Sequence, residues 1–369
     1  MRTLITNIKS LVQVEEKPKI AVCGQDMSSI NCIDNAYLII ENDKIVDFGQ
    51  MSQLQDTNAE KIIDAKNRFI LPSFCDSHTH LVYSGSREIE YIDKIKGLSY
   101  EEIAKRGGGI LNSAKRLQEA SEEELYEDAM QRLEEITSYG TGAVEIKSGY
   151  GLTTEAELKM LRVIRKLKEN LADFIDVFCD TGFFTVEETD RMLFAGVKNG
   201  LIPKIHANEL DYSGGIQVGV KYNALSVDHL ECVGEEEIAC LKASQTMPTI
   251  LPGAAFFLNM PYSPARTMIN AGLPIAMASD FNPGSSPSGN MQMVLTFACV
   301  NYKLTPQEAI NATTINSAYA MGISQTHGSI ARGKQANFYI TKDIPTIEYI
   351  PYYYGTNKVD RVFLNGKEQ

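Results

Sequence analysis

Short apolar runs alternate with helical stretches through the middle of this chain, and this alternation limits the folds open to it. The runs number seven and lie at residues 69–75, 141–147, 174–179, 203–206, 224–228, 247–252 and 274–278. Helical patterns occupy 154–171, 185–199, 235–244 and 305–321, the last opening on a capping box at Thr305-Pro-Gln-Glu308. Apolar strands that alternate with helices predict an α/β core with a parallel sheet.

The placement of polar residues favours a barrel over an open sheet. Histidine or aspartate follows four of the runs, from residue 78 to residue 280. Polar groups at the carboxyl ends of many strands are typical of a (β/α)8 barrel, whereas an open doubly wound sheet binds its ligands at one switch point. The sequence therefore predicts a TIM-like barrel, with a strand count one short of eight.

The two ends of the chain have a different pattern. Residues 36–48 read as a hairpin that turns at Asn42-Asp43, and residues 336–341 and 359–364 read as strands, the second followed by an Asn365-Gly366 turn. Strand-rich segments at both ends can pair into one unit. We therefore predict a composite β domain from residues 1–68 and 329–369, and a barrel domain from residues 69–328.

The run at 69–75 leads into a His-x-His pair, His78 and His80. Side chains two apart on a strand point to the same face, and neutral imidazole is the commonest metal ligand in proteins. A lone His-x-His is weak evidence, but the chain has only five histidines. Two more, His206 and His229, end strand-like runs, whereas His327 lies in a polar loop and is expected at the surface. The pattern predicts a metal site.

Asp280 is the fourth candidate ligand, because it follows the apolar run at 274–278 and opens a turn-dense loop. One interpretation is that Asp280 caps the following turn. The other is metal ligation with proton transfer. Three imidazoles and a carboxylate suit Zn²⁺ or Fe with a water in the open position, and such an ion lowers the pKa of that water to roughly 7.

Other residues near the strand ends could contact a substrate, and each has an ordinary structural alternative. His229 could face the substrate or be a core histidine, and Glu209 could reach the metal site or be a solvated loop carboxylate. Arg87 offers a planar fork for a carboxylate, or is an ordinary surface arginine. Tyr150 lies between glycines that let the backbone approach a ligand.

Composition limits the partners and the compartment. The net charge is −12 without a Lys/Arg-rich run, which argues against nucleic acid or an anionic membrane as the partner. The seven cysteines include no C-x-x-C pair and are expected to be reduced thiols. The start of the chain has no signal-peptide pattern, and no apolar run approaches membrane-spanning length. We therefore expect a cytoplasmic protein with a small-molecule substrate.

Several motifs together resemble the amidohydrolase superfamily and, within it, the imidazolonepropionase family. They include Asp76-Ser-His-Thr-His80, Val144-Glu-Ile-Lys-Ser-Gly-Tyr-Gly151, Lys204-Ile-His-Ala-Asn-Glu209, Ser226-Val-Asp-His-Leu230 and Ser279-Asp-Phe-Asn-Pro-Gly-Ser285. The resemblance runs nearly end to end. It implies a metal-dependent hydrolase barrel flanked by a β-sandwich built from both termini, in a homodimer.

The resemblance also implies roles for individual residues. It implies one Zn²⁺ or Fe ion, because the strand at 174–179 carries no lysine that could bridge two metals. The implied metal ligands are His78, His80, His206 and Asp280. The implied contacts to substrate are Arg87, Tyr150, Glu209, His229 and Ser285, and the implied contacts to product are Asn282 and Gly284. The implied catalytic groups are Asp280, His229 and Glu209.

The chain departs from the family pattern at one place, near residues 170–174. Family members have a further strand and helix there, ending in a Phe-Leu-Gly-Ala-His motif whose histidine contacts the imidazolone ring. This chain passes directly from the helical pattern at 154–171 to the run at 174–179. A barrel of seven strands needs an altered tilt or stagger to close, or leaves a slot between two strands.

The expected reaction is hydrolysis of 4-imidazolone-5-propanoate to N-formimidoyl-L-glutamate by a metal-activated water, in histidine degradation. Asp280 would move the proton to the departing nitrogen, His229 and Glu209 would orient the water and the ring, and Arg87 would bind the propionate carboxylate. Two alternatives remain open: another amidohydrolase or deaminase that acts on a ring C–N bond, and a catalytically defective metal-binding member of the superfamily.

Overall fold

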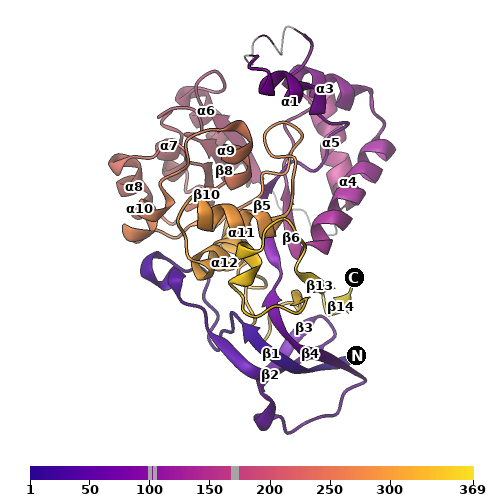
Figure 1. The fold of residues 1–369 in the computed structure, drawn as a ribbon. Helices are drawn as coiled ribbons and strands as arrows, with labels where there is room; N and C mark the ends of the chain where they lie inside the picture. The colour runs from indigo at the N-terminus through magenta and orange to yellow at the C-terminus, as the bar shows by residue number, and fades with distance from the viewer. Residues whose placement is uncertain (99–101, 103–105, 168–173) are drawn as a thin grey trace.

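The two ends of the chain form one mixed β-sheet at one end of the molecule (Figure 1). This computed structural model describes residues 1–98, 102, 106–167 and 174–369. The order of the sheet is β14-β13-β12-β4-β1-β2-β3, and β1 and β4 are its parallel pair. Its strands are β1 (Arg2–Val12), β2 (Cys32–Glu41), β3 (Lys44–Gln50), β4 (Lys61–Pro72), β12 (Phe338–Thr341), β13 (Val359–Leu364) and β14 (Lys367–Glu368). The predicted β unit from both termini is confirmed.

Alternation along the strands gives this sheet two apolar faces. Ile5, Leu38 and Ile40 belong to one buried cluster, whereas their neighbours Leu4 and Ile39 belong to another. Successive side chains of a strand point to opposite faces, so both faces can be apolar only if both are covered. The predicted hairpin is present: β2 and β3 are antiparallel and turn at residues 42–43.

All seven predicted core strands are present and parallel to their neighbours. They are β5 (Phe74–Thr79), β6 (Thr141–Ile146), β7 (Phe174–Cys179), β8 (Ile202–Ala207), β9 (Ser226–His229), β10 (Met247–Ile250) and β11 (Ala276–Met277). Hydrogen bonds join them in two groups, β5-β6 and β11-β10-β9-β8-β7. Part of the predicted first run falls in β4, and β5 carries the chain on to the histidine pair.

The two groups of strands meet along β5 and the end of β11. The backbone N–H of Asp280 donates to the carbonyl of His78 at 3.0 Å, and the N–H of His80 donates to the carbonyl of Phe281 at 2.9 Å. The buried carboxylate of Asp76 accepts from the backbone N–H and the hydroxyl of Ser279 at 2.9 and 2.5 Å. These bonds close one side of the strand arc.

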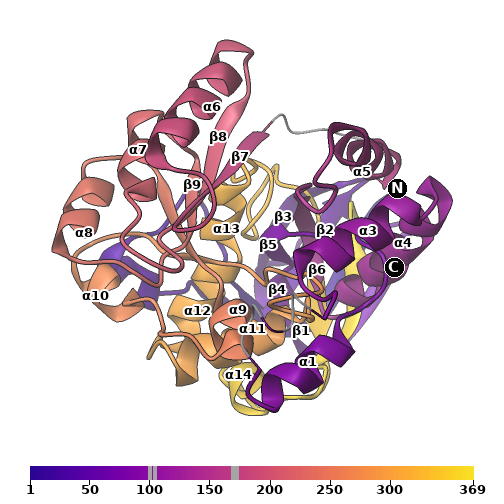
Figure 2. The same cartoon turned by 90° about the horizontal axis from the view of Figure 1, so that it is seen from above.

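The arc is open on its other side, between β6 and β7. In the described part of the chain these two strands belong to different sheets. Viewed from above, α5 and α6, which follow β6 and β7, stand well apart (Figure 2). Only residues 168–173 lie between α5 and β7, too few for a further parallel strand, whose crossover alone takes a dozen or more residues. The strand order of a barrel is therefore present, without closure among the described residues.

Helices cover the outside of the arc, and the four that the sequence predicts begin within one residue of the predicted start. Their bounds are α1 (Glu88–Ile95), α3 (Ile110–Glu119), α4 (Glu122–Ser138), α5 (Thr154–Leu167), α6 (Val186–Lys198), α7 (Gly215–Lys221), α8 (Glu235–Lys242), α9 (Pro252–Leu258), α10 (Ala265–Asn270), α11 (Met291–Val300), α12 (Pro306–Thr313), α13 (Ile315–Ala320) and α14 (Tyr349–Tyr352). Residues 168–171 of the predicted helix at 154–171 lie outside the described residues. The predicted helix at 305–321 is two helices, because Thr314 leaves helical geometry at φ −124° and ψ −90°.

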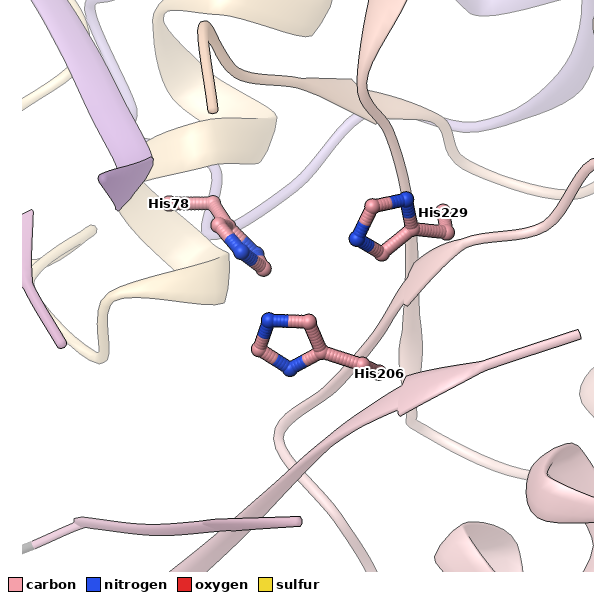
Figure 3. A group of neighbouring side chains, drawn as sticks. All are labelled: His78, His206 and His229. Atoms are coloured by element: carbon pink, nitrogen blue, oxygen red, sulfur yellow. The ribbon is translucent and has the colours of Figure 1, made fainter. Parts of the chain in front are cut away.

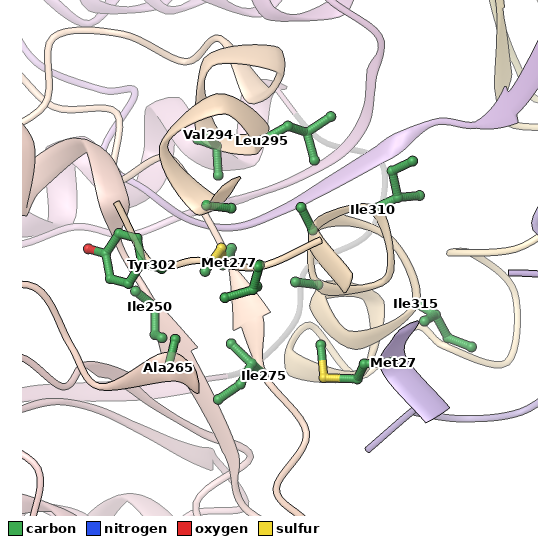
Figure 4. Close-up of a cluster of buried hydrophobic side chains, with 14 of the residues drawn as sticks. Met27, Ile250, Ala265, Ile275, Met277, Val294, Leu295, Tyr302, Ile310 and Ile315 are labelled. Atoms are coloured by element: carbon green, nitrogen blue, oxygen red, sulfur yellow. The ribbon is translucent and has the colours of Figure 1, made fainter. Parts of the chain in front are cut away.

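The largest buried cluster lies between the strands and these helices. It joins Ile250 of β10 and Met277 of β11 to Leu295 of α11 and Ile310 of α12, and Met27 from the N-terminal segment packs into it (Figure 4). The strand ends that carry the site residues are therefore fixed by a dense apolar core. Among the described residues no helix is long and apolar enough to cross a membrane.

Candidate active site

Four of the five histidines meet at the carboxyl ends of the core strands. His78 and His80 lie at the end of β5, His206 in β8 and His229 at the end of β9. The ring centroid of His78 lies 4.4 Å from that of His206 and 5.6 Å from that of His229 (Figure 3). Asp280 follows β11, and its Oδ1 lies 3.6 Å from His78 Nε2 and 3.9 Å from His80 Nε2. The structure thus brings the four predicted metal ligands together.

Two overlapping groups of side chains could hold a metal ion, and both contain His78. One is His78, His206 and His229; the other is His78, His80 and Asp280. Within each group the ligand atoms lie within 4.8 Å of one another. In the described structure His78 Nε2 and His80 Nδ1 are buried without a hydrogen-bond partner. Burial lowers the pKa of His78 and of His80 well below the ordinary value, which keeps both rings neutral as metal ligation requires.

Two of the histidines are oriented by carboxylates, the buried Asp228 and the partly buried Asp176, that sequence reasoning did not single out. His78 Nδ1 lies 2.7 Å from Asp228 Oδ2, and His206 Nδ1 lies 2.8 Å from Asp176 Oδ1. A carboxylate at Nδ1 fixes the ring and leaves Nε2 free to bind a metal. The available signal was an acidic residue inside an apolar strand, which is costly to bury unless it has a partner.

Lys147, just beyond β6, links this network across the opening of the arc. Its ammonium contacts the carboxylate of Asp176 on β7, lies 2.6 Å from Glu145 and lies 3.7 Å from Asp228. Glu145 also accepts from the fully buried Lys204 at 2.6 Å. Burial opposes the charge of Lys147, but Asp176 and Glu145 outweigh it and raise the pKa of the lysine. Charged side chains therefore connect two strands that share no backbone hydrogen bond.

Carboxyl groups surround His229 on the other side of the site. Glu209 Oε2 lies 3.6 Å from His229 Nδ1, and Glu231 Oε2 lies 3.9 Å from it. Burial raises the pKa of Glu209 to about 7, and burial together with Glu209 raises the pKa of Glu231 well above its usual range. Asp180 fixes the Glu209 loop by accepting from the backbone N–H of Glu209 at 2.7 Å. The backbone of His229 has φ 84°, a strained value of the kind found at functional sites.

The loop after β11 is held by Asn282. Its side-chain amide donates to the carbonyl of Asp280 at 2.6 Å and to Ser285 Oγ at 2.7 Å, and its oxygen accepts from the N–H of Gly284 at 2.7 Å. Ser285 Oγ in turn donates to Asp280 Oδ2 at 3.1 Å. Asp280 therefore takes part in the turn as well as facing the histidines, so its two sequence interpretations are compatible. Burial raises the pKa of Asp280 to about 6.

Arg87 and Tyr150 lie beside this loop and the histidines. Arg87 Nε donates to Ser113 Oγ at 2.8 Å, and its guanidinium packs so close to Gly284 that a Cβ there would lie 2.6 Å from Nη1. The rings of Tyr150 and His80 lie 5.3 Å apart. By contrast, His327 lies apart from the site, half-buried with Nδ1 2.8 Å from Thr326 Oγ1, so the prediction of an exposed side chain is wrong.

Comparison with known proteins places this site in a family. The model of the amidohydrolase family matches residues 204–368. Proteins named imidazolonepropionase from Christiangramia forsetii and Flavobacterium johnsoniae are 51% and 52% identical to this chain. The alignments cover the whole of this chain and the whole of each relative. The chain belongs to the imidazolonepropionase family. A relative from Caldanaerobacter subterraneus is 38% identical, with 97% of this chain and 95% of the relative covered.

Solved structures agree on the fold. An adenosine deaminase from Xanthomonas campestris with bound zinc superimposes with a TM-score of 0.74 at 12% identity, covering 99% of this chain and 92% of that one. A 5-methylcytosine deaminase from Klebsiella pneumoniae gives a TM-score of 0.73 at 16% identity, covering 99% of this chain and 97% of that one. At this identity the likeness concerns the fold alone.

The alignments with proteins named imidazolonepropionase include positions that this chain lacks. Those with the first two relatives run over 409 positions against the 369 residues of this chain, so at least 40 positions have no residue here. That length is enough for a strand and its helix. Among the described core strands, β6 and β7 are the neighbours in barrel order that do not pair.

Proposed function

We propose that this protein hydrolyses the ring amide of 4-imidazolone-5-propanoate to N-formimidoyl-L-glutamate. The observation that carries the proposal is the full-length match, at 51% and 52% identity, to relatives named imidazolonepropionase. The convergence of His78, His80, His206, His229 and Asp280 at one end of the strands supports it.

The donor set fits a single Zn²⁺ or iron ion. His78, His80, His206 and Asp280 would hold the ion, because they offer neutral imidazoles and one carboxylate around a shared space. The buried His78 Nε2, which has no partner among the described residues, is the clearest sign of a missing ligand. A bound ion would supply Lewis-acid chemistry, polarising the ring carbonyl and acidifying a water molecule.

The chain's own residues would then position the substrate and move the proton. Asp280, whose burial raises its pKa to about 6, would accept a proton from water and pass it to the departing ring nitrogen. Glu209 and His229 face each other across 3.6 Å and would orient the ring and the water. Arg87 would bind the propionate carboxylate, with Tyr150, Ser285, Asn282 and Gly284 completing the contacts.

Turnover with metal analysis tests this function. Purified protein is mixed with 4-imidazolone-5-propanoate, the product is identified by mass spectrometry, and the metal content of the same sample is measured. Arg87→Ala should raise KM most and Asp280→Ala should abolish turnover, and the reverse pattern would contradict the roles. One metal per chain without hydrolysis would show a defective member, and ammonia release from a purine or pyrimidine would show a deaminase.

We extend the proposal to the architecture and the assembly. The domain division is 1–68 with 329–369 against 69–328, the first a β-sandwich and the second a barrel one strand short. The protein is a homodimer in the cytoplasm. Light scattering on the eluted peak tests the dimer, and a monomeric mass would exclude it.

A further inference from the structure

The carboxyl group of Glu231 is buried beside the site without a role in the scheme above. Its side chain is 1% exposed, and in the described structure neither of its oxygens has a hydrogen-bond partner. Leaving a buried polar group unpaired is costly, so such a group in a native fold calls for an explanation. Glu231 follows His229 by two residues, and its Oε2 lies 3.9 Å from His229 Nδ1.

Two further groups are buried without a partner and can donate a hydrogen bond. His229 Nδ1 and the hydroxyl of Tyr302 are both buried without a hydrogen-bond partner in the described part of the chain. Tyr302 is 3% exposed, and burial, together with the charge of Glu231, raises the pKa of its hydroxyl. An imidazole N–H and a phenol O–H can each donate one bond, and a carboxyl group can accept both. Glu231 thus offers the acceptor atoms that these two donors need.

Two other histidines of the site show the same arrangement. His78 and His206 each present Nδ1 to a carboxylate, the buried Asp228 at 2.7 Å and the partly buried Asp176 at 2.8 Å. In His229 the ring nitrogen farther from the point of attachment faces His78 and His206, so Nδ1 lies on the outer side (Figure 3). His78 and His206 thus have an acceptor at Nδ1, whereas Nδ1 of His80 and Nδ1 of His229 have no hydrogen-bond partner among the described residues. Of these two rings, His229 is the one with carboxyl groups, Glu209 and Glu231, within 4 Å of Nδ1.

We propose that Glu231 is a positioning residue that accepts the Nδ1–H of His229 and the hydroxyl of Tyr302, so that a bare Nε2 of His229 faces the substrate. Glu209 is closer to Nδ1, at 3.6 Å, but its side chain is 10% exposed and is assigned to the substrate. The side chain of Glu231 is 1% exposed and is therefore the carboxyl partner that is shielded from solvent. The inference rests on the proposed function only in giving His229 a substrate to face.

The tautomer of His229 gives a test that needs no turnover. With five histidines in the chain, 15N-histidine labelling yields few signals, and the spectrum of His229→Gln assigns the one from His229. Wild-type protein should show Nδ1 protonated and Nε2 bare. Glu231→Ala should shift His229 away from this state, and Glu231→Gln, whose amide oxygen still accepts, should preserve it. An unchanged tautomer in Glu231→Ala would overturn the proposal.

Kinetics add a second measurement. Glu231→Ala should lower kcat about 10- to 100-fold with a smaller change in KM, as loss of an orienting partner does, and Glu231→Gln should restore most of kcat. Tyr302→Phe should lower kcat less, and should add no further loss in the Glu231→Ala background because both act through one carboxyl group. Additive losses would contradict the shared role. Glu237→Gln, at a buried carboxyl on α8 that binds Gln217, is the matched control.

If Glu231→Ala does not fold, Tyr302→Phe and Glu231→Gln still decide the question through the spectrum. Tyr302→Phe removes one hydroxyl and should leave the proton on His229 Nδ1. A proton on His229 Nε2 in the wild-type protein would overturn the inference without any variant. A failure of the proposed reaction appears differently, as an absence of product in the wild type with the predicted tautomer intact.

Discussion

Replacing Lys147 with methionine tests whether charge holds the two sides of the open arc together. The ammonium is 5% exposed and has three carboxylates within 4 Å, of which Asp176 lies across the opening on β7. Methionine keeps the length and the apolar stem of the side chain but removes the cation. The buried Asp228 and the partly buried Asp176 would then lose the counter-charge that they share.

The magnitude follows from the burial of these groups. Removing one partner of a buried ion pair typically costs about 3 to 5 kcal/mol, because the remaining charge stays desolvated. We expect Lys147→Met to lower the free energy of unfolding by that amount. The matched control is Lys115→Met, since Lys115 is 73% exposed and pairs with Glu119 at 3.9 Å on the surface. An exposed pair contributes about 0 to 1 kcal/mol.

Urea unfolding followed by circular dichroism, with chelator present in every sample, measures both variants. Chelator removes any contribution from bound metal to stability. Lys147→Met with Asp176→Asn should recover part of the loss, because the second change removes an unpaired charge. A loss below about 1 kcal/mol in Lys147→Met, no larger than in the surface control, would refute the argument that this ion pair replaces the missing backbone contacts.

Three further predictions concern single side chains. Gly284→Ala should displace the Arg87 guanidinium, which lies 2.6 Å from the added carbon, and lower kcat/KM up to about 100-fold, mainly through KM; an unchanged KM would contradict this. Asp228→Asn should weaken metal binding about 10- to 100-fold in a chelator competition, because its histidine partner loses its orienting carboxylate. Glu308 is paired with an arginine that holds its pKa below the ordinary value although burial acts to raise it. The pair therefore stabilises the fold above pH about 4.3, and this stabilisation is lost as the pH falls below that value. Over that falling range of pH, the unfolding free energy of the wild type should drop more steeply than that of Glu308→Gln. Equal slopes for the two proteins would refute this prediction.

Local patterns predicted much of the fold because they depend on neighbours in sequence. The seven core strands, the hairpin at 36–48 and the capping box at Thr305 were all predicted from the sequence. The break at Thr314 was not, since its conformation goes with contacts outside the helix: its hydroxyl donates to Gln13 at 2.9 Å, 301 residues away.

The candidate site divides in the same way. The histidines were recognisable because each ends a strand, and strand ends of a parallel core meet at one face. The groups that orient them were not, because the pairing of His78 with Asp228 spans 150 residues and that of His206 with Asp176 depends on strand order. In the sequence Glu231 and Tyr302 are ordinary polar residues, and no local pattern distinguishes them.

From the sequence we could predict which segments are strands and helices, which side chains can bind a metal, and that one strand–helix unit of the family is absent. This was possible because hydrophobic period, turn chemistry and ligand type are local properties. The tertiary structure decided where the arc opens, that Lys147 connects β6 and β7 there, and which carboxylate faces each imidazole. These are matters of distance between parts of the chain far apart in sequence, and packing of the whole core sets them.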